Sequence, residues 1–97
     1  MKGVRREKLG MEIQRVVSEL LCFEVSDPRI RHVTVRGVRL TGDGGIARVY
    51  YESGLASPEK KSLRLALEHA SGFLKKGIAT RLELKSVPQL EFYEESL

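Results

Sequence analysis

The first periodic segment of the chain has the spacing of an amphipathic helix. From about Arg5 to Glu24, apolar residues recur at steps of three and four, which gathers them on one helix face: Leu9, Ile13, Val16, Val17, Leu20 and Leu21. Gly10 weakens this helix by about 1 kcal/mol relative to alanine, and nothing in the sequence compensates for it. Pro28 ends the helix, because proline lacks an amide donor and keeps the preceding Asp27 out of the helical conformation.

The next pattern has the two-residue period of β-strands. Apolar residues alternate along residues 33–40 but slip by one position around Gly37, which predicts a β-bulge there. Residues 41–45, with the sequence Thr-Gly-Asp-Gly-Gly, are typical of a tight turn, since glycine adopts positive φ at no steric cost. Residues 46–52 are then the returning strand of a hairpin.

A second helix is predicted from Ser57. This residue is suited to accept hydrogen bonds from the free amides, and Pro58 suits the first helical position. An apolar face follows at helical spacing: Leu63, Ala66, Leu67, Ala70, Phe73 and Leu74. Gly72 interrupts this helix, so we expect a kink at Ser71-Gly72 and a short third helix that ends near Lys85.

The last strand completes the predicted fold. Pro88 ends the helical region, and apolar residues then alternate with polar ones from Gln89 to Tyr93. The order is helix, strand, strand, helix, kink, helix, strand. It fits an α+β fold in which a three-stranded sheet carries all its helices on one face. With 97 residues, 41% of them apolar, we expect a single domain over residues 1–97 with one modest core.

The net positive charge of the chain indicates which class of partner it binds. All seventeen basic residues and ten of the thirteen acidic ones lie in residues 1–85, so this part of the chain carries a net charge of +7. A positive field of this kind attracts polyanions, of which nucleic acid is the commonest for a cytoplasmic domain. No stretch approaches the ~18 apolar residues of a membrane span, and no signal-peptide pattern is present. We therefore expect a cytoplasmic monomer that binds nucleic acid and no membrane.

The sequence lacks the residue patterns of an enzyme or a metal site. Cys22 is the single cysteine, so no intramolecular disulfide is possible, and no Cys/His spacing suits zinc. Its place beside Leu21 predicts an inert packed thiol. His32, His69 and the scattered carboxylates form no convincing catalytic pair, and no GxxxxGK phosphate loop is present. We expect no catalytic residue, cofactor, metal or small-molecule substrate.

Four short blocks of the sequence are more specific than the order of elements. They are Asp27-Pro28-Arg29, Ala47-Arg48-Val49-Tyr50, Ala70-Ser71-Gly72-Phe73-Leu74-Lys75 and Pro88-Gln89-Leu90-Glu91-Phe92. Together they resemble the ribosome-binding factor A family, which has a type II KH-like fold, and the match runs from about Arg5 to Glu95. The resemblance implies an assembly factor that binds the small ribosomal subunit and its rRNA near the decoding region. It also implies a role in late maturation of that RNA, followed by release before translation.

The predicted kink is the main candidate RNA-binding site. The resemblance implies that an Ala-x-Gly kink replaces the usual KH glycine loop, and Ala70-Ser71-Gly72 matches it. A bend without a bulky side chain exposes backbone amides and a helix start to a phosphate or sugar. Basic residues on or after the second helix are placed to neutralise neighbouring phosphates: Arg64, Lys75, Lys76 and Arg81.

For two further groups of residues, two arginines and three tyrosines, a purely structural role is an alternative to RNA binding. Arg29 and Arg31 flank the loop into the first strand, where they either reach RNA or cap the carbonyls of the first helix. The tyrosines are expected in core or edge packing, because no aromatic pair recurs in the manner of an RNA-recognition motif. They are Tyr50, Tyr51 and Tyr93.

Two other functions stay open. A DNA-binding helix-turn-helix module would place the predicted third helix in a major groove, although Ile78 and Leu82 face the core in this pattern and leave few side chains for base edges. A protein interaction domain would use a sheet edge or the apolar residues Leu55 and Leu65. Binding that survives nuclease treatment and high salt would indicate this last function.

Overall fold

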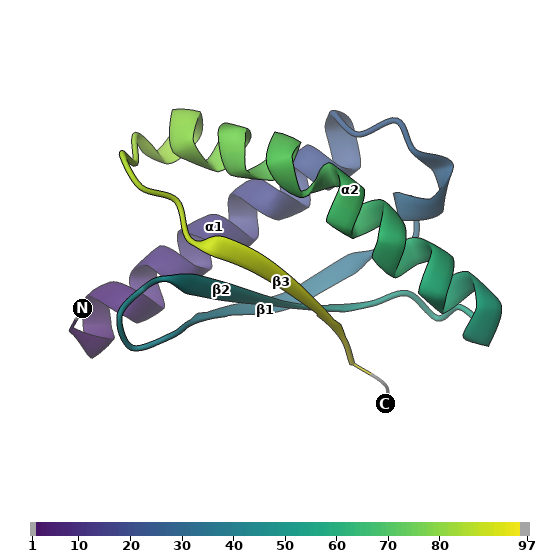
Figure 1. Cartoon of the computed structure of the whole chain (residues 1–97), viewed down its shortest axis with the longest axis horizontal. Coiled ribbons are helices and arrows are strands. Elements are labelled where there is room, and N and C mark those ends of the chain that lie inside the picture. The colour runs from purple at the N-terminus through teal and green to yellow at the C-terminus, as the bar shows by residue number, and fades with distance from the viewer. Residues whose placement is uncertain (1, 96–97) are drawn as a thin grey trace.

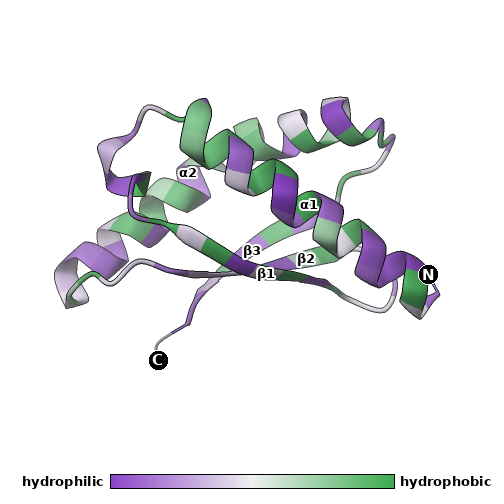
Figure 2. Cartoon of the chain, turned by 180° about the vertical axis from the view of Figure 1, so that it is seen from behind, coloured by the Kyte–Doolittle hydropathy of each residue, from purple (hydrophilic) through white to green (hydrophobic). Residues whose placement is uncertain are grey.

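Two helices cover one face of a three-stranded sheet in the computed structural model, which describes residues 2–95 (Figure 1). The view from behind shows both helices on the same side of the sheet (Figure 2), so the other side is open. This confirms the predicted α+β class. In chain order the elements are α1 (Gly3–Phe23), the 3-10 helix η1 (Pro28–Ile30), β1 (Thr34–Leu40), β2 (Ile46–Glu52), α2 (Ser57–Leu82) and β3 (Gln89–Glu94).

The sheet is mixed, with the strand order β1-β2-β3. β1 and β2 pair antiparallel, whereas β2 and β3 pair parallel because α2 carries the chain back across the sheet. The register of β1 on β2 shifts between Val35 and Gly37, which confirms the predicted bulge. In the hairpin turn the Asp43 carboxylate accepts hydrogen bonds from the Gly45 N–H and the Thr41 hydroxyl, both at 2.9 Å.

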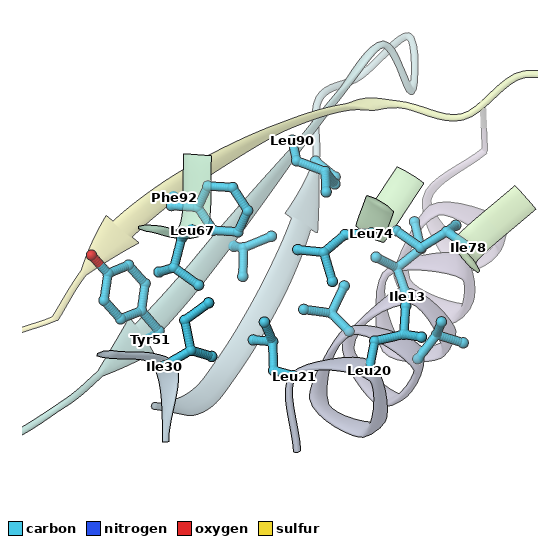
Figure 3. Packing of buried hydrophobic residues seen from close by; sticks show 14 of the residues in the cluster. Ile13, Leu20, Leu21, Ile30, Tyr51, Leu67, Leu74, Ile78, Leu90 and Phe92 are labelled. Carbon is cyan, nitrogen blue, oxygen red and sulfur yellow. The ribbon is translucent and has the colours of Figure 1, made fainter. Parts of the chain in front are cut away.

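The core lies between the sheet and the two helices (Figure 3). The predicted apolar stripe of α1 is buried from Ile13 to Leu21. β2 and β3 contribute alternate residues, because successive side chains of a strand point to opposite faces. The buried residues of these two strands are Ala47, Val49, Tyr51, Leu90 and Phe92.

Gly10 allows α1 to approach the sheet closely. A Cβ atom added at Gly10 would lie 2.7 Å from the backbone carbonyl oxygen of Val38 on β1. Real Cβ atoms do not come this close to a carbonyl oxygen, so any side chain at this position would push the helix away from the strand. This contact compensates for a glycine inside the helix, which the sequence alone left unexplained.

α2 differs from the prediction at its start, its middle and its end. Ala56 is the N-cap and Ser57 is already helical, without a capping hydrogen bond from its side chain, so the predicted role of Ser57 is wrong. The helix is continuous to Leu82, where Glu83 turns into the left-handed region with φ of 53°. The predicted third helix is therefore the second half of α2. The ribbon changes direction about midway along α2 without a break (Figure 1). A single glycine weakens a helix but does not end it.

Two side chains predicted to be buried are exposed. Phe73 retains 47% of its accessible surface, because it lies at the edge of the apolar face that Leu74 and Ile78 continue. Cys22 is exposed next to Phe23, since the core-facing stripe of α1 ends at Leu21. The prediction of a packed thiol is thus wrong.

Candidate nucleic-acid interface

The middle of α2 brings most of the candidate RNA-binding residues together. Leu63, Leu74 and Ile78 face the core, and at 3.6 residues per turn Gly72 lies on the opposite side of the helix. Lys75 and Lys76 follow Gly72 by about one turn and lie on either side of its line. The same stretch of helix carries the candidates Arg64 and Ser71, whereas the candidate Ala70 packs against the core, on the side of α2 away from Gly72.

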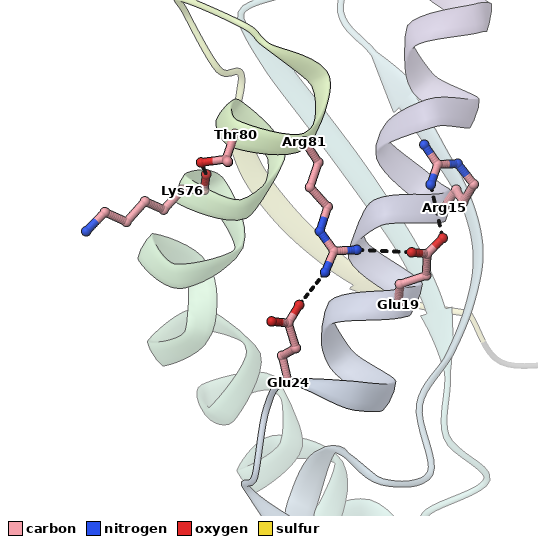
Figure 4. A network of polar contacts seen from close by, with 6 residues as sticks. All are labelled: Arg15, Glu19, Glu24, Lys76, Thr80 and Arg81. Atoms are coloured by element: carbon pink, nitrogen blue, oxygen red, sulfur yellow. Dashed lines mark hydrogen bonds and ion pairs between the residues drawn. The ribbon is translucent and has the colours of Figure 1, made fainter.

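The basic side chains around Gly72 form few and weak ion pairs with the other residues that the structure describes. Neither Lys75 nor Lys76 forms an ion pair or a side-chain hydrogen bond within residues 2–95, and Lys76 points away from α1 (Figure 4). Arg64 Nε is 4.0 Å from Glu68 Oε2, and both side chains are more than half exposed. Exposed pairs of this kind contribute little to stability and exchange readily for a stronger anion. These three cations are available to phosphates.

Gly72 itself is not required by the packing of the fold. It is exposed, and a Cβ atom added to it would meet no described atom within 4 Å. Glycine in a helix interior nevertheless costs roughly 0.5–1 kcal/mol relative to alanine. The glycine thus leaves a flat patch of exposed backbone on the outer side of α2, flanked by Lys75 and Lys76.

Arg81 occupies a different position from the other candidates. It follows Leu63 by about five helical turns and therefore lies on the core-facing side of α2. From there its side chain reaches α1. Arg81 Nη1 donates to Glu19 Oε2 at 3.0 Å, its Nη2 donates to Glu24, and Arg15 reaches the other oxygen of Glu19 at 3.0 Å (Figure 4). Its guanidinium links the two helices, and two carboxylates balance its charge.

Arg29 is held by its own loop. Its Nη2 and Nε donate to the Asp27 carboxylate at 2.7 Å and 3.2 Å, and its Nη1 reaches the Ser62 carbonyl of α2 at 3.5 Å. It therefore does not cap the carbonyls of α1, which was one of the two predicted uses. Arg31 is exposed and has no side-chain partner among the described residues.

The Asp27 carboxylate carries a pH-dependent contribution to stability. The Arg29 side chain, and then its backbone N–H, lower the pKa of Asp27 from 3.8 to about 2. A depressed folded-state pKa stabilises the fold above the ordinary value and loses this effect as the pH falls from about 3.8 to about 2. We expect Asp27→Asn to lower the unfolding midpoint at neutral pH and to match the wild type near pH 2. Urea unfolding across this range tests it, and an equal deficit at both ends would contradict it.

Phe73 is the residue of this surface that the sequence pattern misassigned. It lies between two shallow grooves, one shared with the loop 24–30 and His69, the other with Leu20, Gly77 and Thr80. A helical wheel would have identified it, because Ala70, Leu74 and Ile78 already fill the core-facing line. An exposed aromatic ring next to Gly72 suits stacking with a base.

Residues 2–95 show neither a metal-binding cluster nor a membrane-spanning helix. No three residues among His, Cys, Asp and Glu gather in a way that would hold a metal ion. In the same part of the chain, neither helix combines the length and the apolar character that a bilayer crossing requires.

Comparison with known proteins identifies the family. The family model described as ribosome-binding factor A matches residues 5–97. Ribosome-binding factor A of Leuconostoc mesenteroides is 42% identical over 94 residues, which are 95% of this chain and 80% of that protein.

Solved structures agree with the sequence matches. The crystal structure of ribosome-binding factor A from Thermus thermophilus has a TM-score of 0.78 at 30% identity, covering 92% of this chain and 94% of that one. A homology model of the T. thermophilus factor, fitted into the cryo-EM map of a 30S complex, has a TM-score of 0.75 at 30% identity and covers 91% and 92%. The chain belongs to the ribosome-binding factor A family.

Proposed function

We propose that this protein is a ribosome-binding factor that binds the small ribosomal subunit and its rRNA and assists late maturation of that subunit without catalysing a reaction. The observation that carries the proposal is the exposed Gly72 backbone on the outer side of α2, flanked by Lys75 and Lys76, which have no ion-pair partner within residues 2–95. The similarity to a protein fitted into a 30S complex supports the choice of subunit. The proposal places the protein in the cytoplasm, where small subunits mature.

In the proposed interface, α2 provides the primary contacts. Gly72 and the neighbouring Ser71 form the surface that a phosphate or sugar approaches, and Lys75, Lys76 and Arg64 neutralise phosphates around it. Ala70 packs against the core and is not part of this surface. Arg31 adds a peripheral cation. Arg29 and Arg81 contribute by holding the loop and the two helices, and they reach RNA only if it displaces their carboxylate partners.

The protein would act through differential affinity. A factor that binds one conformation of rRNA more tightly than others shifts the population toward that conformation, and no bond needs to be made or broken. The protein would thereby favour the mature fold of the RNA.

The DNA-binding alternative conflicts with the shape of α2. A helix-turn-helix module needs two helices joined by a turn, with the second helix free to enter a major groove. Here α2 is continuous from Ser57 to Leu82, and Ile78 in its second half is fully buried. The protein-interaction alternative has less support, because Leu65 is only 42% exposed and Leu55 is partly buried.

Co-sedimentation with purified small subunits, large subunits and duplex DNA at several salt concentrations tests the proposal. We expect binding to the small subunit alone, with an affinity that falls as salt rises, because phosphate contacts release counterions. Equal binding to DNA, or no binding to small subunits at low salt, would overturn it.

Gly72→Ala separates stability from binding. Alanine fits the open space at this position, so we expect the unfolding free energy to rise by roughly 0.5–1 kcal/mol. The added methyl group would keep the RNA backbone from the helix, so the affinity for small subunits should fall. Urea unfolding and co-sedimentation on the same preparation measure both. A stabilised variant with unchanged affinity would show that Gly72 has no place in the interface.

A further inference from the structure

The open face of the sheet carries a pair of neighbouring aromatic side chains, Tyr50 and Tyr93. Tyr50 on β2 is the register partner of Gly37 on β1 and of Tyr93 on β3, so these three positions cross the sheet in one line. Val49, Tyr51 and Phe92 on the same strands are buried, which places Tyr50 and Tyr93 on the face away from the helices. The sequence predicts core or edge packing for the three tyrosines: Tyr51 packs in the core, whereas Tyr50 and Tyr93 lie on the open face, with Tyr93 on the edge strand β3.

The rings of Tyr50 and Tyr93 stack on each other, and the Tyr93 ring is partly exposed. Their centroids are 5.7 Å apart with an interplanar angle of 27°, and Tyr93 retains 43% of its accessible surface. The Tyr93 hydroxyl donates to Glu91 Oε1 at 2.7 Å, which orients the ring. Beside Tyr50, a Cβ atom added at Gly37 would meet nothing within 4 Å. The register partner thus leaves space next to the Tyr50 ring.

A second row, two residues along the strands, carries positive charge. Arg39 and Arg48 are register partners, and Arg48 is in turn the partner of Glu91. Arg48 Nε lies 4.0 Å from Glu91 Oε1, and Arg39 has no side-chain partner among the described residues. Two strand steps are about 7 Å, so the arginines lie one side-chain row away from the tyrosines on the same face.

Aromatic rings beside weakly paired arginines match the chemistry of single-stranded nucleic acid. Bases stack on exposed aromatic side chains regardless of sequence, and arginines hold the backbone. We propose that the open sheet face is a second RNA-binding surface, on which bases of single-stranded RNA stack on Tyr50 and Tyr93 while Arg39 and Arg48 hold phosphates. This rests on the proposed function only in taking RNA as the ligand, because the face lies on the opposite side of the sheet from α2.

Binding of an unstructured single-stranded RNA oligonucleotide, followed by fluorescence anisotropy, tests this surface. We expect Tyr50→Leu/Tyr93→Leu to weaken binding by about ten-fold or more, from the usual contribution of one stacked base. The matched variant Tyr50→Phe/Tyr93→Phe keeps both rings and should bind within about two-fold of the wild type. Quenching of tyrosine fluorescence on binding provides a direct reading of stacking, because the chain has no tryptophan.

A second variant, Gly37→Val, keeps the test valid if the leucine variant does not fold. Gly37→Val fills the space beside Tyr50, and valine suits a strand, so the fold should tolerate it while oligonucleotide binding falls. Equal oligonucleotide binding by the wild type, the leucine variant and the valine variant would overturn the inference. So would an oligonucleotide that fails to bind the wild type.

The two proposals fail in different ways. If the wild type does not bind small subunits, the proposed function is contradicted, but the oligonucleotide result still stands. Normal small-subunit binding combined with oligonucleotide binding that ignores the tyrosines would contradict this inference alone.

Discussion

Lys75→Glu/Lys76→Glu should weaken binding to small ribosomal subunits by about ten- to a hundred-fold near 100 mM salt. Both lysines lie beside the exposed Gly72 backbone and have no anionic partner within residues 2–95. Each phosphate contact contributes about 0.9 to the slope of log affinity against log salt, so that slope should become shallower by about two. Co-sedimentation over a salt series measures both quantities.

The matched control reverses two charges elsewhere. Arg5→Glu/Lys8→Glu changes the net charge of the protein by the same amount at exposed positions near the start of α1. It tests for the general effect of net charge on binding to a polyanion. We expect it to leave the affinity within about three-fold of the wild type. An equal loss in both variants would mean that binding follows overall charge and not the surface around Gly72.

Gly10→Ala should destabilise the protein by about 1–3 kcal/mol, although alanine favours helices. The added Cβ atom would lie 2.7 Å from the Val38 carbonyl oxygen, a backbone atom of β1 that has no rotamer with which to move away. The cost of moving α1 off the sheet exceeds the gain of about 1 kcal/mol in helix propensity. Because each kcal/mol shifts the unfolding temperature of a domain of this size by about 4–8 °C, thermal unfolding measures the effect easily.

Gly72→Ala is the control for Gly10→Ala, since the same substitution meets open space on α2. The two variants should move the unfolding temperature in opposite directions. A stabilised Gly10→Ala variant would contradict the close packing of α1 on β1.

The sequence predicts those elements whose causes are local. The apolar stripe of α1, the hairpin and its bulge near Gly37 all follow from residue spacing and turn chemistry, and the structure reproduces them. The parallel pairing of β3 with β2 depends on how α2 crosses the sheet. Short apolar runs do not encode such a pairing, because any edge of the sheet would bury them equally well.

The remaining differences arise from contacts between distant segments. The glycine at position 10 is explained only by the close approach of Val38. Arg81 links the two helices only because the fold brings Glu19 and Glu24 next to it. The pairing of Tyr50 with Tyr93 likewise depends on the register of β3. The sequence predicts that Gly72 separates two helices, but α2 is continuous from Ser57 to Leu82, because one glycine costs a helix only about 1 kcal/mol relative to alanine.

Directed hydroxyl-radical cleavage from α2 tests most directly whether its outer side faces small-subunit RNA. In a Cys22→Ser background, an iron chelate would be attached at His69→Cys, one turn before Gly72, or at Lys8→Cys near the start of α1; both positions are exposed. The account predicts strong cleavage of small-subunit rRNA from residue 69 and weak cleavage from residue 8. Cleavage from residue 8 with none from residue 69 would contradict the account, because α1 and not α2 would then face the RNA.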